Sequence, residues 1–111
     1  MTITILKLEG RLDTTQTAKI EMPFTVKAGS LIGPDALAVI DLSEVTYISS
    51  MGIRLLVTTL KQFRSRNIRF ATVQPRDALA RECLEIANLV PLLHLAESHD
   101  EACASLGQGT G

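Results

Sequence analysis

Residues 39–56 read VIDLSEVTYISSMGIRLL. A short apolar run is followed by a polar stretch, a pair of serines and apolar residues at helical spacing. We expect a buried strand over residues 37–42, a loop, and a helix over residues 50–65. Ser49 and Ser50 then lie at the helix N-terminus, where free backbone N–H groups and the helix dipole favour negative charge. A phosphate added there would be tolerated by the fold and recognised by a partner.

The rest of the chain alternates between strand-like and helix-like patterns. Residues 2–9 and 68–73 alternate apolar and polar side chains, whereas helical spacing recurs after Asp77, which can cap a helix. Pro23 argues against a long first helix, and the prolines and glycines of residues 23–36 indicate a loop. We expect strands over residues 2–9, 37–42, 68–73 and 92–96, and helices over residues 15–22, 50–65, 79–88 and 100–106.

This order of elements predicts an α/β fold with a mostly parallel sheet. We expect a four- to five-stranded sheet flanked by about four helices. The sheet and helices form a single domain over residues 1–106, followed by a flexible tail over residues 107–111. Sites for partners or ligands in such folds lie at the carboxyl ends of the strands. The serine pair lies in a loop at one of these ends.

Composition and charge exclude several classes of function. The chain has 111 residues, 46% of them apolar, which suits one domain with one core. The formal net charge of -1 gives no electrostatic footprint for nucleic acid, and we interpret the cluster of Arg64, Arg66 and Arg69 as a solvated helix end. No signal peptide and no apolar run of membrane-spanning length are visible, so we expect a cytoplasmic protein without a membrane span.

The residues that could support catalysis or metal binding are scattered. Cys83 and Cys103 form no CxxC pair, and with His94 and His99 they lack the spacing of a zinc site. We expect ordinary thiols in a reducing cytosol and no metal. A serine nucleophile needs a base and an oxyanion hole, and the sequence contains neither a G-x-S-x-G elbow nor a P-loop. We therefore predict no catalytic residue, no cofactor and no enzymatic activity.

On these physical grounds alone, the serine pair is interpreted as a helix cap. A serine at the N-cap position satisfies a free backbone N–H and contributes about 1 kcal/mol. Asp13 or Thr14 can cap the preceding helix in the same way.

Residues 10–13, GRLD, together with residues 39–56, resemble the STAS domain, the family of anti-sigma-factor antagonists and sulfate-transporter tails. A weaker match continues to the end of the chain, and the order of the predicted elements agrees with the family. The resemblance implies a STAS-like fold and, in the family's bacterial antagonists, phosphorylation of a serine just before the helix. By position this residue is Ser50. Ser49 is the second choice, because many antagonists carry an aspartate there.

The resemblance also implies a function without catalysis. The unmodified protein would bind an anti-sigma-factor serine kinase and release a sigma factor, phosphorylation would end the binding, and a serine phosphatase would reset the protein. Asp13 matches a loop residue beside the phosphorylation site, and Arg54, one turn along the helix, could screen the phosphate. The residues expected to contact the partner are Asp13, Thr14, Ser49, Met51 and Arg54.

Two other functions stay open at this point. One is a scaffold subunit that is not phosphorylated, in a lipid-transport ATPase or a larger signalling complex. The other is a small-molecule or nucleotide-binding module, for which the sequence gives no specific support. Many members of the family begin with an extra strand that this sequence lacks, so we expect an uncovered sheet edge that could allow a homodimer.

Overall fold

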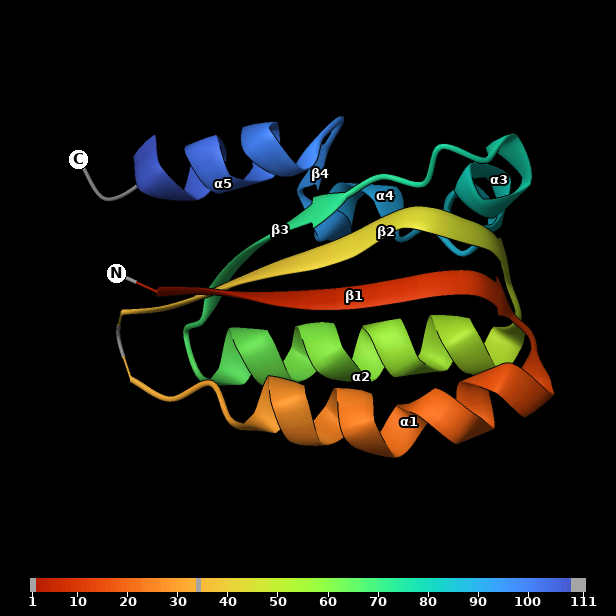
Figure 1. Ribbon diagram of the computed structural model, residues 1–111, viewed down its shortest axis with the longest axis horizontal. Helices are drawn as coiled ribbons and strands as arrows, with labels where there is room; N and C mark the ends of the chain where they lie inside the picture. The colour runs from red at the N-terminus through yellow and green to blue at the C-terminus, as the bar shows by residue number, and fades with distance from the viewer. Residues whose placement is uncertain (1, 34, 109–111) are drawn as a thin grey trace.

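Four parallel strands form the centre of the computed structural model, which describes residues 2–33 and 35–108, and they lie in the order β1-β2-β3-β4 (Figure 1). The strands are β1 (Thr2–Leu12), β2 (Ala36–Ile48), β3 (Arg69–Val73) and β4 (Leu95–Ala96). The helices are α1 (Thr14–Gly29), α2 (Ser50–Ser65), α3 (Ala78–Ile86), α4 (Val90–Leu93) and α5 (His99–Gln108). The predicted α/β class with a mostly parallel sheet is confirmed.

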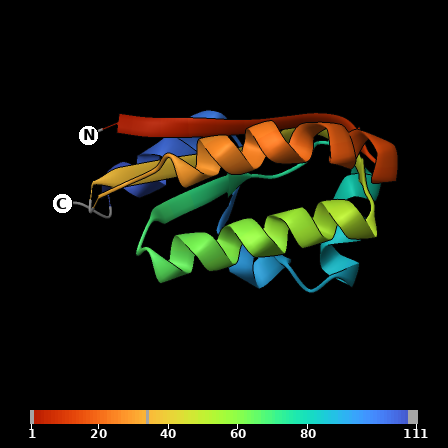
Figure 2. The ribbon, with the colours of Figure 1, turned by 90° about the horizontal axis from the view of Figure 1, so that it is seen from below.

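Helices cover both faces of the sheet. α1 and α2 lie side by side along one face, and α5 packs against the other (Figures 1 and 2). On β2, Ala38 and Ile40 belong to the core under α1 and α2, whereas Leu37 and Val39 belong to the core under α5. This alternation follows from strand geometry, and it explains why a strand covered on both faces is nearly continuously apolar.

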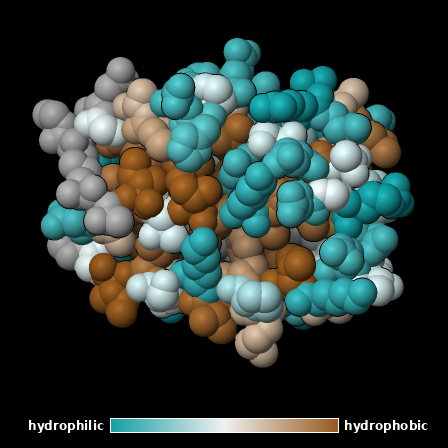
Figure 3. All heavy atoms as spheres, in the orientation of Figure 1, coloured by the Kyte–Doolittle hydropathy of each residue, from teal (hydrophilic) through white to brown (hydrophobic). Residues whose placement is uncertain are grey.

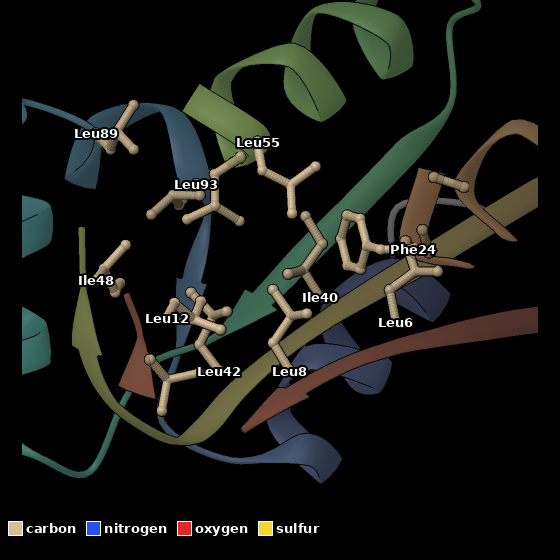
Figure 4. Close-up of a cluster of buried hydrophobic side chains, with 14 of the residues drawn as sticks. Leu6, Leu8, Leu12, Phe24, Ile40, Leu42, Ile48, Leu55, Leu89 and Leu93 are labelled. Carbon is tan, nitrogen blue, oxygen red and sulfur yellow. The ribbon is translucent and has the colours of Figure 1, made fainter. Parts of the chain in front are cut away.

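The larger core lies between the sheet and the helices of the α1–α2 face. Figure 4 shows side chains from several elements that converge there, among them Leu8 of β1, Ile40 of β2, Phe24 of α1, Leu55 of α2 and Leu93 of α4. Each of these five side chains is at most 7% exposed. This core fixes α2 against the central strands, and α2 carries the serine pair at its start.

The loop predicted after residue 42 is wrong, because β2 continues to Ile48. Its register with β1 slips twice, between Lys7 and Glu9 and between Gly10 and Arg11, and each time β2 contributes one residue more than β1. These irregularities are β-bulges, which break the alternation of apolar and polar side chains by which a strand is recognised in a sequence.

Local contacts support the bulged part of β2. The Asp41 carboxylate accepts a hydrogen bond from the backbone N–H of Ser43 at 2.9 Å, and the Ser43 carbonyl accepts one from the N–H of Arg76 at 3.2 Å. Gly10, at the second bulge, has a φ of +74°, a conformation that favours glycine. Asp41 therefore holds the backbone that follows it.

The prediction for the first helix is also wrong, because α1 continues through Pro23 to Gly29 where we expected a loop. Thr17, Phe24 and Ala28 are buried, so the packed face of the helix extends on both sides of the proline. A proline in a helix interior costs about 3 kcal/mol or more. Tertiary packing of this face outweighs that cost, as it outweighs propensity in most helices of proteins.

The strand expected over residues 92–96 is reduced to the two residues of β4. One turn of helix, α4, precedes it and has Pro91 in its first turn, where a missing N–H costs nothing. His94, which we expected inside the strand, is exposed and ends α4 in a left-handed conformation with φ 53°. The apolar run at this point therefore encodes a turn and a short strand.

The remaining elements follow the predictions closely. α2 and β3 have the expected bounds within one residue, and the Asp77 carboxylate caps α3 by accepting from the N–H groups of Leu79 and Ala80. α5 ends at Gln108, so residues 107 and 108 of the predicted tail are helical. Residues 109–111 lie outside the described residues, and the domain limit at residue 106 stays a prediction.

No strand pairs with the outer edge of β1 in the described part of the chain. Lys7 of this strand forms an ion pair with Glu44, and the Glu44 carboxylate raises the pKa of Lys7. A lysine on an edge strand disfavours pairing with other chains, although here the lysine is already paired with a residue of β2. On the face that carries β1, apolar surface gathers toward one end, as Figure 3 shows. The homodimer stays a prediction.

Replacing Pro23 by alanine should stabilise the protein. The new N–H can complete the helical hydrogen-bond ladder of α1, and Pro23 itself is exposed, so no packing is lost. We expect the free energy of unfolding to rise by about 1–3 kcal/mol in urea denaturation. The matched control is Met22→Ala at the neighbouring position, 71% exposed, which should change it by less than about 0.5 kcal/mol. A loss of stability in Pro23→Ala would mean that α1 needs the proline.

Candidate partner-binding site at two helix N-termini

Two helices begin side by side at the carboxyl end of the sheet. The last register pair of β1 and β2 joins Leu12 to Ile48, and the N–H of Ser49 donates to the carbonyl of Leu12 at 2.9 Å. Asp13 and Ser49, the residues that directly follow these two strand ends, are the N-caps of α1 and α2. The pairing of two strands therefore fixes the position of one helix start against the other.

The two caps have the same backbone geometry. Asp13 has φ -77° and ψ 178°, and Ser49 has φ -78° and ψ 174°. The Asp13 carboxylate accepts from the N–H of Gln16 at 2.8 Å, and the Ser49 hydroxyl oxygen accepts from the N–H of Gly52 at 3.3 Å. Neither helix has an acidic residue in its first turn, so the positive ends of both helix dipoles point at this surface, and the Asp13 carboxylate offsets part of the charge at the start of α1.

The two serines differ in their surroundings. Ser49 is half-buried, and both its N–H and its hydroxyl oxygen take part in the hydrogen bonds that start α2. Replacing such a cap by alanine costs about 0.5–2 kcal/mol. Ser50 is the first residue of the helix and is exposed, and within the described chain its hydroxyl forms no hydrogen bond. Ser49 therefore serves the fold, whereas the Ser50 hydroxyl is accessible.

Gly52 allows the start of α2 to approach the strand ends. It is buried, and a Cβ atom placed on it would lie 2.8 Å from Cγ2 of Ile48, 3.3 Å from Cβ of Leu12 and 3.4 Å from the Leu12 carbonyl oxygen. The neighbouring atoms belong to buried side chains and backbone, which cannot move away freely. Glycine at this position holds α2 against the register pair that aligns the two helices.

The other residues predicted for the site lie around these two starts. Thr14, the first residue of α1, is exposed, and Met51 in the first turn of α2 is half-buried. Arg54 is exposed one turn along α2. The structure thus brings Asp13 and Thr14 to the same end of the sheet as the serines, with Arg54 further along the helix.

Sequence reasoning missed a cation–aromatic pair beside the site. Arg11 and Tyr47 are register partners at the ends of β1 and β2, and the Arg11 guanidinium carbon lies 4.6 Å from the centre of the Tyr47 ring. The ring attracts the cation and limits its freedom, which keeps a positive charge near the helix starts. Only the bulged register pairs these two residues, so no sequence spacing could have indicated the contact.

The described residues contain no group of three or more histidine, cysteine, aspartate or glutamate side chains placed to hold a metal ion. Among the helices that the structure describes, none combines the length and the hydropathy that crossing a bilayer requires. The arrangement at the helix starts is a surface with two capped helices, exposed hydroxyl side chains at Thr14 and Ser50, and nearby cations.

Comparisons with known proteins place the chain in a family. A family model of the STAS domain matches residues 1–102, so the chain belongs to the STAS domain family. The fold is similar to that of an anti-sigma factor antagonist from Mycobacterium paratuberculosis, with a TM-score of 0.79, 21% identity, and coverage of 94% of this chain and 85% of that one. The unphosphorylated form of the anti-sigma factor antagonist SpoIIAA is also similar, with a TM-score of 0.74, 16% identity, and coverage of 96% and 89%. No curated protein matches the chain.

Replacing Gly52 by alanine should destabilise the protein. The added methyl group meets Ile48 at 2.8 Å, and overpacking of this kind costs about 1–3 kcal/mol, more than the helix propensity of alanine returns. The matched control is Gly29→Ala, also in a helix, where a Cβ meets nothing within 4 Å and stability should stay equal or rise. Equal urea midpoints for the wild type and Gly52→Ala would contradict the close approach at the start of α2.

Proposed function

We propose that this chain is an anti-sigma-factor antagonist, a non-enzymatic regulator that binds an anti-sigma-factor serine kinase and is inactivated by phosphorylation at Ser50. The observation that carries the proposal is the exposed, unbonded Ser50 hydroxyl at the start of α2, beside the capped start of α1. Membership of the STAS family and the likeness in fold to two anti-sigma factor antagonists support it.

Ser50 suits phosphorylation better than Ser49. A kinase must reach the hydroxyl from solvent, and Ser50 is exposed whereas Ser49 is half-buried. Phosphorylation of Ser49 would also disturb the cap, because its hydroxyl oxygen accepts the N–H of Gly52. A phosphate on Ser50 leaves that hydrogen bond in place, so the geometry supports Ser50 as the acceptor.

The charge of the phosphate acts on the partner more than on the fold. Phosphorylation adds about -1.5 to -2 charges. At the start of α2 the helix dipole and the free N–H groups favour this charge, and Arg11 and Arg54 are exposed cations in the surrounding region. A kinase surface packed against Asp13, Thr14 and Met51 would instead meet a new anion beside the Asp13 carboxylate. The modification would therefore break the complex while the protein stays folded.

The proposal includes the rest of the cycle. A serine phosphatase removes the phosphate and restores binding, and both steps take place in the cytoplasm, where the kinase has ATP. The chain supplies no catalytic group and no cofactor to either reaction. The open outer edge of β1 is the place where a second copy could pair, and a homodimer is part of the proposal.

Incubation with a cognate anti-sigma-factor kinase and ATP should add one phosphate, measured by intact mass. Ser50→Ala should abolish the addition, whereas Ser49→Ala, with its fold checked by thermal midpoint, should keep it. Ser65→Ala, an exposed serine at the far end of α2, is the matched control. Phosphate that survives replacement of both Ser49 and Ser50, or no phosphate at all, would contradict the proposal. Protein that co-purifies from its host with a transporter and carries no phosphoserine would favour the scaffold function.

A charge at position 50 should separate binding from stability. Ser50→Asp should weaken kinase binding about tenfold or more in calorimetry, because an unpaired charge is buried in the complex, and should leave the thermal midpoint nearly unchanged. Thr58→Asp, which adds the same charge at an exposed position two turns along α2, should bind like the wild type. Equal affinity of Ser50→Asp and the wild type would place the kinase surface elsewhere.

A further inference from the structure

A cavity lies at the opposite end of α2 from the serines. It measures about 820 Å³ and is bounded by the C-terminal half of α2, the start of β3, the α4 turn and the end of α5. α2 lies between α1 and α4 (Figure 2), and the cavity is on the α4 side. Small-molecule sites commonly measure about 300–1,000 Å³, so this cavity has the size of a ligand site.

The cavity exists because β4 is short. β4 pairs only with Thr72 and Val73, so in the described chain β3 has no neighbouring strand on that side from Arg69 to Ala71. A longer strand would cover this part of β3 and close the space between α2 on one face of the sheet and α5 on the other. His94, just before β4, is in a left-handed conformation and lines the cavity.

One part of the cavity wall is apolar. Val57 and Leu60 contribute from α2, Phe70 from β3, Leu92 from α4 and Leu106 from α5. Leu92 is 44% exposed, although it is a large aliphatic side chain. Apolar surface that lines a concave site is the surface on which an apolar ligand binds, because both are removed from water on contact.

The other part of the wall is positively charged. Lys61 and Arg64 follow Val57 and Leu60 on the same face of α2, with the spacing i, i+3, i+4 and i+7. Arg69 adds a third cation. No aspartate or glutamate is among the described residues that line the cavity, and neither Lys61 nor Arg64 forms an ion pair within the described chain. A chain with a net charge of -1 thus concentrates unpaired cations at one apolar cavity.

The three arginines of the sequence cluster have separate surroundings. Arg69 donates to the carbonyl of Leu106 at 2.8 Å, so its guanidinium is held between β3 and α5. Arg66 donates to the carbonyl of Gly29 at 3.2 Å, beside α1, and does not line the cavity. Arg64 remains an exposed cation at the cavity, close to Lys61. The simple interpretation as a solvated helix end therefore covers only part of the cluster.

We propose that this cavity binds an amphipathic monocarboxylate, such as a medium-chain fatty acid. The acyl chain would lie against Val57, Leu60 and Leu92, and the carboxylate would pair with Lys61 and Arg64. A carboxylate matches the guanidinium of Arg64, whose parallel N–H groups can bind both oxygens. The alkyl chain matches the aliphatic part of the wall, to which Val57, Leu60, Leu92 and Leu106 contribute.

A nucleotide fits these walls less well. Base recognition relies on a few precisely placed polar groups, and beside its three cations the described lining offers Asn67, His94 and Ser105 for this role. The aromatic ring of Phe70 is already engaged, with its centre 5.5 Å from that of Phe63 and 5.1 Å from that of His94. No glycine-rich phosphate loop borders the cavity. An aliphatic chain with one anionic end uses both the apolar and the cationic parts of the described lining.

This site is independent of the proposed phosphorylation. Ser50 and Arg64 lie at opposite ends of α2, about 21 Å apart along the helix at 1.5 Å per residue. Failure of the kinase experiments would leave the cavity unchanged, and failure of ligand binding would leave the phosphorylation proposal unchanged.

Titration of the ¹⁵N-labelled protein with sodium decanoate below its micelle concentration tests the proposal. We expect saturable shifts of the amide signals of residues 57–70 and 92–94, with the signals of residues 10–16 unchanged. Sodium butyrate, which lacks the long chain, and decyltrimethylammonium, which has the same chain and the opposite charge, should not saturate the site. Equal binding of either compound, or no saturable shift with decanoate, would overturn the proposal.

A pair of double variants tests the role of the cations. Lys61→Gln with Arg64→Gln should weaken decanoate binding about tenfold or more, because hydrogen bonds to two charged groups are lost. Lys19→Gln with Arg81→Gln removes two exposed cations on α1 and α3 that do not line the cavity, and should bind decanoate like the wild type. Spectra of the free variants confirm that they are folded. Equal affinities of the two double variants would overturn the assignment of Lys61 and Arg64.

Discussion

The parallel pairing of β1 with β2 is the constraint on which the functional end of the molecule depends. It runs to the register pair of Leu12 and Ile48 and closes with the hydrogen bond from the Ser49 N–H to the Leu12 carbonyl. Because α1 and α2 start immediately after these residues, the same pairing sets two helix N-termini next to each other. Gly52 lets α2 pack directly onto this strand end. A change in register would separate the starts and misplace both caps.

This arrangement explains how one surface can be both structural and regulatory. Asp13 and Ser49 each accept from one of the free N–H groups that a helix start leaves, which helps to hold the fold. Ser50, one position later, does not cap the helix and is exposed to solvent. In the proposed function the fold tolerates a phosphate there, and a partner surface does not. The cap and the phosphorylation site are thus adjacent residues with separate roles.

The main helices and strands could be predicted from the sequence, but the register between the strands could not. The apolar run of residues 37–42 and the helical spacing of residues 50–65 predicted β2 and α2, because both patterns reflect burial against neighbours on known faces. The bulges of β2 were missed because they interrupt the alternation on which a strand prediction depends. The Arg11–Tyr47 contact was missed for the same reason, since it depends on the bulged register. The length of α1 was missed because packing by Phe24 and Ala28 outweighs Pro23. Cross-strand pairing and tertiary packing depend on residues far apart in the sequence, so local sequence patterns do not predict them.

The hydrogen bond from the Ser49 N–H to the Leu12 carbonyl aligns the two helix starts. Native-state hydrogen exchange measures it directly, because an amide held in this way exchanges only when the surrounding structure opens. The Ser49 amide should be protected as strongly as the amides of Val39 and Ile40 at the centre of β2, both in the wild type and in Ser50→Asp. Exchange of the Ser49 amide as fast as that of the exposed Ile32 would contradict the account.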